Sequence, residues 1–170
     1  MELDGSTPLS VAAALLKNQM EEGTECPCCG QLAKIYRRKI NSAMAYGMIL
    51  FFKKFGWDKR WVHVPSETGL SRLGGDWAKL ALWGLIEERA SDRDDSGPHA
   101  GWWRITDRGV GWVVGRVCVP KSVYIYNGNV LRFDQDESVG IRDALRDRFN
   151  YAELMLGVVL PPEDGQMSLF

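Results

Sequence analysis

The sequence predicts an α+β fold, and three observations lead to this prediction. Apolar residues recur at helical spacing in the first third of the chain, "RWVHVP" and "WWRIT" have the composition of short strands, and "YNGN" interrupts an alternating stretch as a hairpin turn does. The 170 residues, 45% of them hydrophobic, are enough for one domain with a core. We expect a globular body over residues 1–157 and a flexible tail over residues 158–170.

The charge and hydropathy of the chain argue against two classes of protein, general polyanion binders and membrane proteins. The net charge of -1 and the pI near 6.1 argue against an indiscriminate polyanion binder, so nucleic-acid binding would depend on local patches. No apolar run approaches the roughly 18 residues that span a bilayer, and the acidic start "MELDGSTPLS" lacks the basic segment of a signal peptide. We expect a cytoplasmic protein that does not enter a membrane.

Two helices are predicted in the first third of the chain. The first begins at Pro8, with Ser6 or Thr7 as its cap, and runs to Gly23. The second follows the cysteine cluster and covers roughly residues 32–55, where apolar residues recur at helical spacing up to Gly56.

The second predicted helix would carry a basic face. Four polar residues follow the i, i+3, i+4, i+7 pattern: Lys34, Arg37, Arg38 and Asn41. Between Gln31 and Arg60 the chain has eight basic residues and one acidic residue. Such a surplus can contact phosphates with strongly salt-dependent affinity, and the alternative is an ordinary solvated helix face.

The middle of the chain predicts a helix, a Gly-Gly break, a second helix and a strand from near Leu85 in "SETGLSRLGGDWAKLALWGLIEERA". The polar loop "SDRDDSGPHAG" leads to the strand "WWRIT" and the helix "DRGVGWVVG". This order is typical of a winged helix-turn-helix. A hairpin at Asn127-Gly128 and one or two helices in "ESVGIRDALRDRFNYAELM" complete the expected body, which also has N-terminal helices and a cysteine turn.

"LALWGLIEERASDRDD" and "WWRITDRGVGWV" resemble the second half of a MarR-type winged helix, a likeness that covers about 45 residues from Leu70 to Val114. In it Gly84 permits the helix end and Thr106 caps the next helix. The resemblance makes three basic residues candidates for DNA contact: Arg72, Lys79 and Arg93. Because Lys79 is the only basic residue of the presumed recognition helix, the element can equally be structural or protein-binding.

Two further stretches, "YRRKINSAMA" and "IRDALRDRFNYAELM", are similar to small proteins encoded by bacteriophages of actinobacteria. This resemblance implies a phage origin, and hence a host bacterial cytoplasm, without implying an activity.

"CPCCG" has the form of a zinc knuckle, in which Cys26 and Cys29 hold one ion and Gly30 permits the turn. A structural zinc takes four ligands, and no second CxxC is present in the sequence. The remaining ligands would come from four residues: Cys28, His63, His99 or Cys118. We take Cys26, Cys28, Cys29 and His63 as the candidate set, and the alternative is a cluster of reduced thiols without metal.

"QMSLF" at residues 166–170 resembles the pentapeptide by which bacterial replication and repair proteins bind the DNA polymerase III β sliding clamp. The resemblance implies that Gln166 forms hydrogen bonds at the rim of the clamp groove and that Met167 fills a shallow site beside Ser168. It also implies that Leu169 and Phe170 enter the deep pocket. "LPPEDG" would hold the peptide away from the body, and the alternative is that the two apolar side chains fold back onto it.

The sequence shows no paired carboxylates, nucleophile and base set, or phosphate-binding glycine loop typical of an enzyme. We therefore expect a non-enzymatic, phage-encoded accessory protein that binds the clamp, with possible zinc and DNA contacts. A winged-helix transcription regulator is the alternative.

Overall fold

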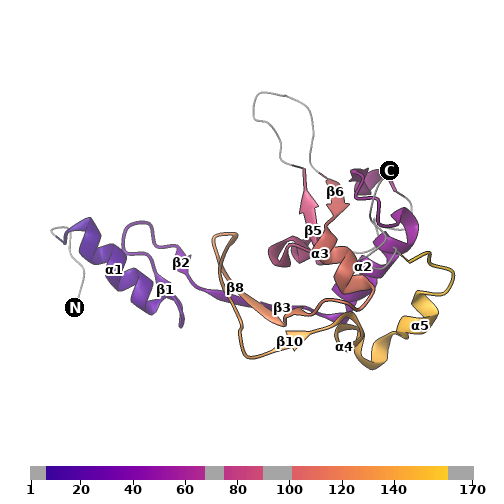
Figure 1. The fold of residues 1–170 in the computed structure, drawn as a ribbon. Coiled ribbons are helices and arrows are strands. Elements are labelled where there is room, and N and C mark those ends of the chain that lie inside the picture. Colours follow the sequence, from indigo (N-terminus) through magenta and orange to yellow (C-terminus); the bar gives the residue numbers. More distant parts are fainter. Residues whose placement is uncertain (1–6, 68–74, 90–100, 161–170) are drawn as a thin grey trace. The chain divides into compact units, whose positions relative to one another are not determined.

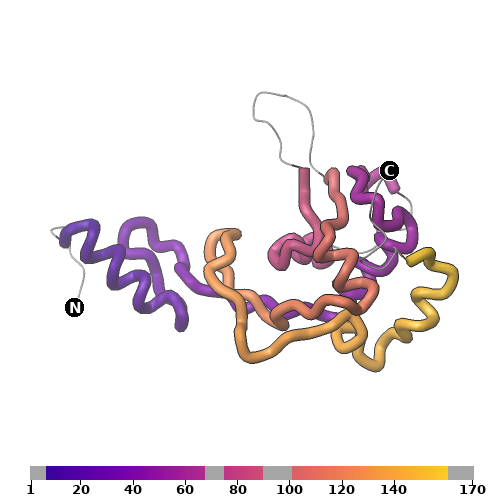
Figure 2. Tube along the Cα trace, viewed as in Figure 1, coloured from indigo at the N-terminus to yellow at the C-terminus, as the bar shows by residue number. Residues whose placement is uncertain are grey.

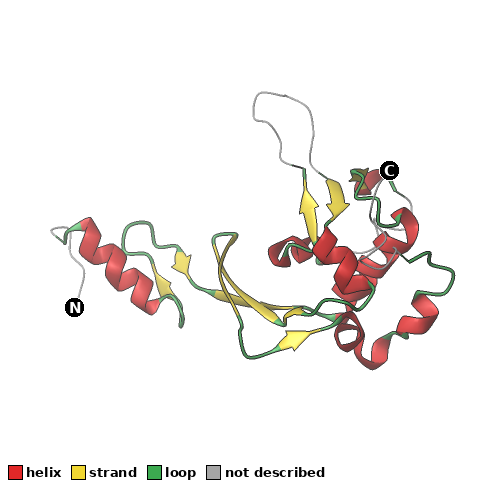
Figure 3. Cartoon of the chain, viewed as in Figure 1, coloured by secondary structure: helices red, strands yellow, loops and turns green. Residues whose placement is uncertain are grey.

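The computed structural model describes residues 7–67, 75–89 and 101–160. Helices and antiparallel strands both contribute to it, so the chain is an α+β protein, as the sequence predicts (Figure 1; Figure 3). None of the described helices is long and apolar enough to cross a membrane.

The chain divides into two compact units, and each unit combines two separate segments. The first unit consists of Met1–Lys39 and Ser122–Asp134, and the second of Ile40–Lys121 and Gln135–Phe170.

The first unit pairs an N-terminal helix with two groups of strands. Its described elements are α1 (Leu9–Gln19), β1 (Thr24–Glu25), β2 (Leu32–Ala33), β3 (Tyr36–Lys39), β8 (Ser122–Tyr126) and β9 (Asn129–Phe133). β1 and β2 form a small antiparallel hairpin, and β8 lies between β3 and β9 in a three-stranded antiparallel sheet. Figure 2 shows the β8–β9 hairpin beside the much earlier β3 segment.

The predicted hairpin at Asn127-Gly128 is confirmed. Both residues have positive φ angles, 47° at Asn127 and 75° at Gly128, as the tight turn of a two-residue hairpin requires. The turn joins β8 to β9 with Tyr126 opposite Asn129.

The prediction of one helix over residues 32–55 is wrong for its first ten residues. Residues 32–39 supply β2 and β3, and only Ser42–Phe55 form a helix, α2. Asn41 caps this helix, because its Oδ1 accepts a hydrogen bond from the Met44 N–H at 2.9 Å. The pairing of β3 with β8, which begins at residue 122, outweighs the local helical pattern. Gly56 ends α2, as predicted.

The second unit contains α2 and the remaining elements. They are β4 (Val62–His63), η1 (Val64–Ser66), η3 (Trp77–Trp83), β5 (Ile86–Glu88), β6 (Trp102–Ile105), α3 (Asp107–Val113), β7 (Val119–Pro120), β10 (Ser138–Val139), α4 (Ile141–Leu145), η4 (Arg146–Arg148) and α5 (Tyr151–Leu154). β6 lies between β4 and β5 in a three-stranded antiparallel sheet, and β7 pairs with β10.

The core of the second unit surrounds α2. Met48, Ile49 and Phe52 are fully buried on this helix, which contacts η3, α3 and α4. Two tryptophans join the core and satisfy their indole N–H groups on backbone carbonyls: Trp83 donates to Pro120 at 2.7 Å and Trp112 to Val139 at 3.1 Å. Burial of these large side chains holds the short elements together.

The segment from η3 to α3 follows the predicted order of helix, strand, strand and helix. Its first helix is a 3-10 helix that ends at Gly84, where φ is 68°. β5 begins at Ile86, close to the predicted start. Thr106 caps α3, as predicted, by accepting a hydrogen bond from the Gly109 N–H at 3.0 Å. The helix predicted in "SETGLSRL" lies mostly outside the described residues.

Candidate functional site

The cysteine cluster forms the turn of the β1–β2 hairpin. The N–H of Cys26 donates to the Gln31 carbonyl at 2.8 Å, and the N–H of Gly30 donates to the Cys26 carbonyl at 2.8 Å. Gly30 has a φ of 69°, so it adopts the left-handed conformation that the sequence predicts for it. These two bonds close a short loop at the end of the hairpin.

The thiol of Cys26 is influenced by the two cysteines that follow it. Hydrogen bonds from the backbone of Cys28 and then of Cys29 lower the pKa of the Cys26 thiol, because they stabilise its thiolate. Cys28 and Cys29 are exposed. Thiolates are the ligands that zinc prefers, so Cys26 and Cys29 can supply two ligands to one ion.

The other candidate ligands belong to the second unit. His63 lies in β4, where its Nδ1 and the Ser66 hydroxyl are 2.5 Å apart and its ring packs against Trp102. Cys118 is exposed just before β7, and His99 lies outside the described residues. Among the described residues, no group of three or more histidine, cysteine or acidic side chains is placed to hold a metal.

The basic residues near the start of the chain do not share a helix face. Lys34 lies between β2 and β3, while Arg37 and Arg38 are neighbours on β3 and therefore point to opposite faces of the sheet. This corrects the predicted basic helix face. The physical reason is the strand period of two, which separates residues that a helix would bring together.

A different cluster replaces the predicted face. In the register of the sheet, Arg37 lies opposite Tyr124, and Tyr124 lies opposite Arg132. The two guanidinium groups lie 5.8 Å and 4.0 Å from the centroid of the Tyr124 ring. Cation–π contacts of this kind stabilise the sheet surface. Arg132 was not a sequence candidate, because only the strand register reveals that it shares a face with Arg37.

Each arginine of this cluster also has an acidic partner. Arg37 Nη2 lies 2.5 Å from Asp134 Oδ2, whose side chain is only 9% exposed, and Arg132 Nη2 lies 2.7 Å from Glu21 Oε1. The second pair joins β9 to the turn after α1. These carboxylates reduce the positive potential that the cluster offers to a phosphate.

The candidates from the winged-helix resemblance are only partly described. Lys79 lies on η3 and forms an ion pair with Asp76, three residues earlier. Arg72 and Arg93 lie outside the described residues. The described part of the segment therefore presents a lysine that is already paired with a carboxylate.

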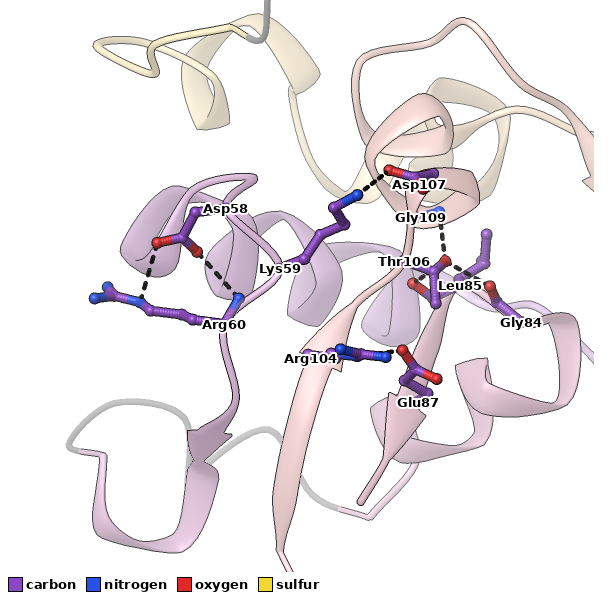
Figure 4. A network of polar contacts seen from close by, with 10 residues as sticks. All are labelled: Asp58, Lys59, Arg60, Gly84, Leu85, Glu87, Arg104, Thr106, Asp107 and Gly109. Carbon is purple, nitrogen blue, oxygen red and sulfur yellow. Dashed lines mark hydrogen bonds and ion pairs between the residues drawn. The ribbon is translucent and has the colours of Figure 1, made fainter. Parts of the chain in front are cut away.

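The second unit also contains polar contacts around the start of α3 (Figure 4). The Thr106 hydroxyl donates to the carbonyls of Gly84 at 2.6 Å and Leu85 at 3.1 Å, while it accepts from Gly109. Lys59 reaches Asp107 at 2.9 Å. The Thr106 contacts tie the end of η3 to α3, and the Lys59 pair ties the segment after α2 to the same helix; both are structural.

One further cluster on β6 was not predicted. Arg104 pairs with Glu87 on β5, and its guanidinium carbon lies 4.5 Å from the centroid of the Trp61 ring. Arg104 is opposite Glu87 in the strand register. Alignment of the two strands from their alternating side chains is the signal that would have found the pair.

The clamp-binding candidates Gln166, Met167, Ser168, Leu169 and Phe170 lie outside the described residues. The described chain that leads toward them is exposed: Leu156 is 77%, Val159 79% and Leu160 56% exposed. These apolar side chains follow α5 and contribute little to the core.

Comparison of the chain with protein-family models, with curated proteins and with solved structures gave no match.

Proposed function

We propose that this protein is a phage-encoded accessory factor, not an enzyme, that binds the bacterial DNA polymerase III β sliding clamp through Gln166–Phe170. The observation that carries the proposal is the sequence "QMSLF", which matches the clamp-binding pentapeptide at four of five positions, with Met167 in place of leucine. By binding the clamp in the host cytoplasm, the protein would modulate or divert host DNA replication.

The chemistry of the peptide supports a contact of moderate strength. Burial of a leucine and a phenylalanine side chain contributes roughly 1.5–3 kcal/mol each, from which the cost of ordering the peptide must be subtracted. A dissociation constant of about 1 μM corresponds to roughly 8 kcal/mol, which hydrogen bonds from Gln166 and the main chain can help to reach. The exposure of Leu156, Val159 and Leu160 is consistent with a chain that leaves the body before the peptide.

A peptide of residues 161–170 provides the direct test. It should bind an actinobacterial β clamp with roughly micromolar affinity and displace a fluorescent clamp peptide. A peptide with alanine at both Leu169 and Phe170 is the matched control, since it keeps the spacer and its charges. Equal affinity of the two peptides, or none for either, would contradict the proposal.

A winged-helix transcription regulator is the second candidate. The order η3, β5, β6 and α3, with β5 and β6 antiparallel, favours a winged-helix architecture for this part of the second unit. A regulator of this kind reads bases with side chains on the helix before the wing. The ion pair of Lys79 with Asp76 weakens that role. Tight binding to one operator, lost in Lys79→Ala, would support the regulator over the clamp-binding factor.

A further inference from the structure

We propose that the cysteine knuckle binds zinc between two copies of the protein, with Cys26 and Cys29 of each copy as the four ligands. The inference starts from the shape of the β1–β2 turn. It is independent of clamp binding, because it involves only the first unit.

The turn presents two sulfur ligands from a fixed backbone. The paired strands position Cys26 directly after Glu25, and the bonds between Cys26 and Gln31 and between Gly30 and Cys26 close the loop. One copy therefore offers half of a tetrahedral zinc site.

The first unit cannot complete this site with its own residues. Its segments 1–39 and 122–134 contain the three cysteines of the knuckle, no other cysteine and no histidine. The spacing of a zinc knuckle, with two residues between the ligands, selects Cys26 and Cys29, whereas Cys28 is only two positions from Cys26. Zinc with two protein ligands would be open to further ligands.

His63 is less suitable as a ligand than a second knuckle. Its Nε2, the ring nitrogen that is not bonded to Ser66, faces Gly101, where a Cβ atom would lie 3.5 Å away. Its ring also packs against Trp102. These contacts hold the imidazole within the β4–β6 region of its own unit.

The surface around the knuckle suits contact with an identical surface. Residues 27–32 are all exposed, and Leu32 retains 60% of its side-chain exposure beside the turn. A two-fold axis through the zinc would place the same groups of both copies around the ion, as in other isologous contacts. The exposed leucines would then lie close to the axis, where their burial adds to the stability of the contact.

The chemistry of the bridge is simple substitution at the metal. Four thiols bind as thiolates, their protons go to solvent, and the ion loses its water ligands without any change in oxidation state. The resulting site carries a charge of 2−.

Zinc content and molecular mass of the full chain test the proposal together. Purified protein should contain one zinc per two chains and have about twice the 19.1 kDa mass of the single chain. Removal of zinc with a chelator should return the wild-type protein to the single-chain mass, and added Zn²⁺ should restore the dimer. This arm needs no variant, so it remains valid even if a substitution unfolds the hairpin.

Four variants identify the ligands. Cys26→Ser and Cys29→Ser should lose both zinc and the dimer, whereas Cys28→Ser, at an exposed position of the same turn, should retain both. His63→Ala should also retain both. One zinc per monomer that is lost in His63→Ala would overturn the proposal, and so would a dimer that persists without metal or a protein that takes up no zinc when Zn²⁺ is supplied.

Discussion

The carbonyl oxygen of Leu85 occupies the space in which a side chain at Gly109 would begin. A Cβ atom at Gly109 would collide with this oxygen and would also lie 2.8 Å from the methyl carbon of Met48. Both neighbours belong to the buried interior of the second unit, where Leu85 and Met48 are 0% exposed. The close approach of α3 to the start of β5 therefore depends on glycine.

Gly109→Ala should lower the free energy of unfolding by about 3 kcal/mol or more, because backbone rather than a flexible side chain opposes the new methyl group. Chemical denaturation would measure the loss. Gly75→Ala is the matched control, since nothing lies within 4 Å of a Cβ atom at Gly75. A loss of similar size in both variants would contradict the steric explanation.

Thr106→Val should lower the free energy of unfolding by roughly 1–2 kcal/mol, because valine keeps the shape of threonine but cannot cap α3 or donate to Gly84 and Leu85. Thr106→Ser keeps the hydroxyl and should recover most of the loss. If Thr106→Ser were destabilising and Thr106→Val were not, the methyl group rather than the hydroxyl would be the stabilising part of Thr106.

Tyr151 links α5 to α3, because its hydroxyl donates to the Val113 carbonyl at 2.9 Å. Burial raises the pKa of this phenol above its ordinary value, and the Arg142 guanidinium partly opposes the rise. The folded state therefore holds the phenolic proton more tightly than the unfolded state does. Its contribution to stability is present below about pH 10 and is lost as the pH rises through the folded-state pKa.

Absorbance titration of the wild type and of Tyr151→Phe would test this assignment. The component missing from the variant should titrate above about pH 10. The difference in unfolding free energy between the two proteins should shrink at higher pH. If the tyrosine signal that is absent from Tyr151→Phe titrated at or below the ordinary pKa of tyrosine, the phenol of Tyr151 would be solvated rather than buried.

DNA binding, if it occurs on the first unit, should depend more on Arg38 and Lys39 than on Arg37. Arg37 already contacts a largely buried carboxylate at Asp134, and a phosphate would have to compete for it. Arg38 and Lys39 are exposed, with no ion pair among the described residues. Replacing either by alanine should reduce the slope of log K against log salt by about 0.9.

Fluorescence anisotropy with oligonucleotides of unrelated sequence would measure these slopes. Arg37→Ala should mainly destabilise the fold, because it leaves the Asp134 carboxylate without this arginine. A strong preference for one sequence, insensitive to Arg38→Ala and Lys39→Ala, would contradict electrostatic binding on this sheet.

Deletion of Leu169 and Phe170 should abolish clamp binding by the full chain and leave the melting temperature almost unchanged. The proposed role of these residues is contact with another protein, and a docking peptide adds little to the core. Gln166→Ala should weaken binding less, through loss of the rim hydrogen bonds. A fall of several degrees in melting temperature would instead indicate that the two side chains pack onto the body.

The features that the sequence predicts correctly depend on neighbouring residues. Asn127-Gly128 specifies its turn, Thr106 its cap, and Gly84 its helix end, each within a few positions. The first ten residues of the predicted helix over 32–55 fail for the opposite reason. They contain good helix formers, but Leu32–Ala33 pair with β1 and Tyr36–Lys39 pair with β8.

The same distinction applies to the candidate site. The spacing of Cys26, Cys29 and Gly30 predicts the turn, because the turn is formed by neighbouring residues. The cluster of Arg37, Tyr124 and Arg132 was not predicted, because three strands from distant parts of the chain must align before it exists. A cluster that forms only when several strands are aligned cannot be identified from the residues of one segment.

The pairing of β3 with β8 has a consequence for synthesis on the ribosome. β3 emerges with Lys39, but its partner begins only at Ser122, after residues 40–121 have been translated. The second unit is likewise incomplete until Leu145 has been translated, because α2 contacts α4, which ends at that residue. A nascent chain that stalls before Ser122 would therefore leave β3 without its partner strand and the side of α2 that contacts α4 uncovered, where chaperones and proteases can reach them.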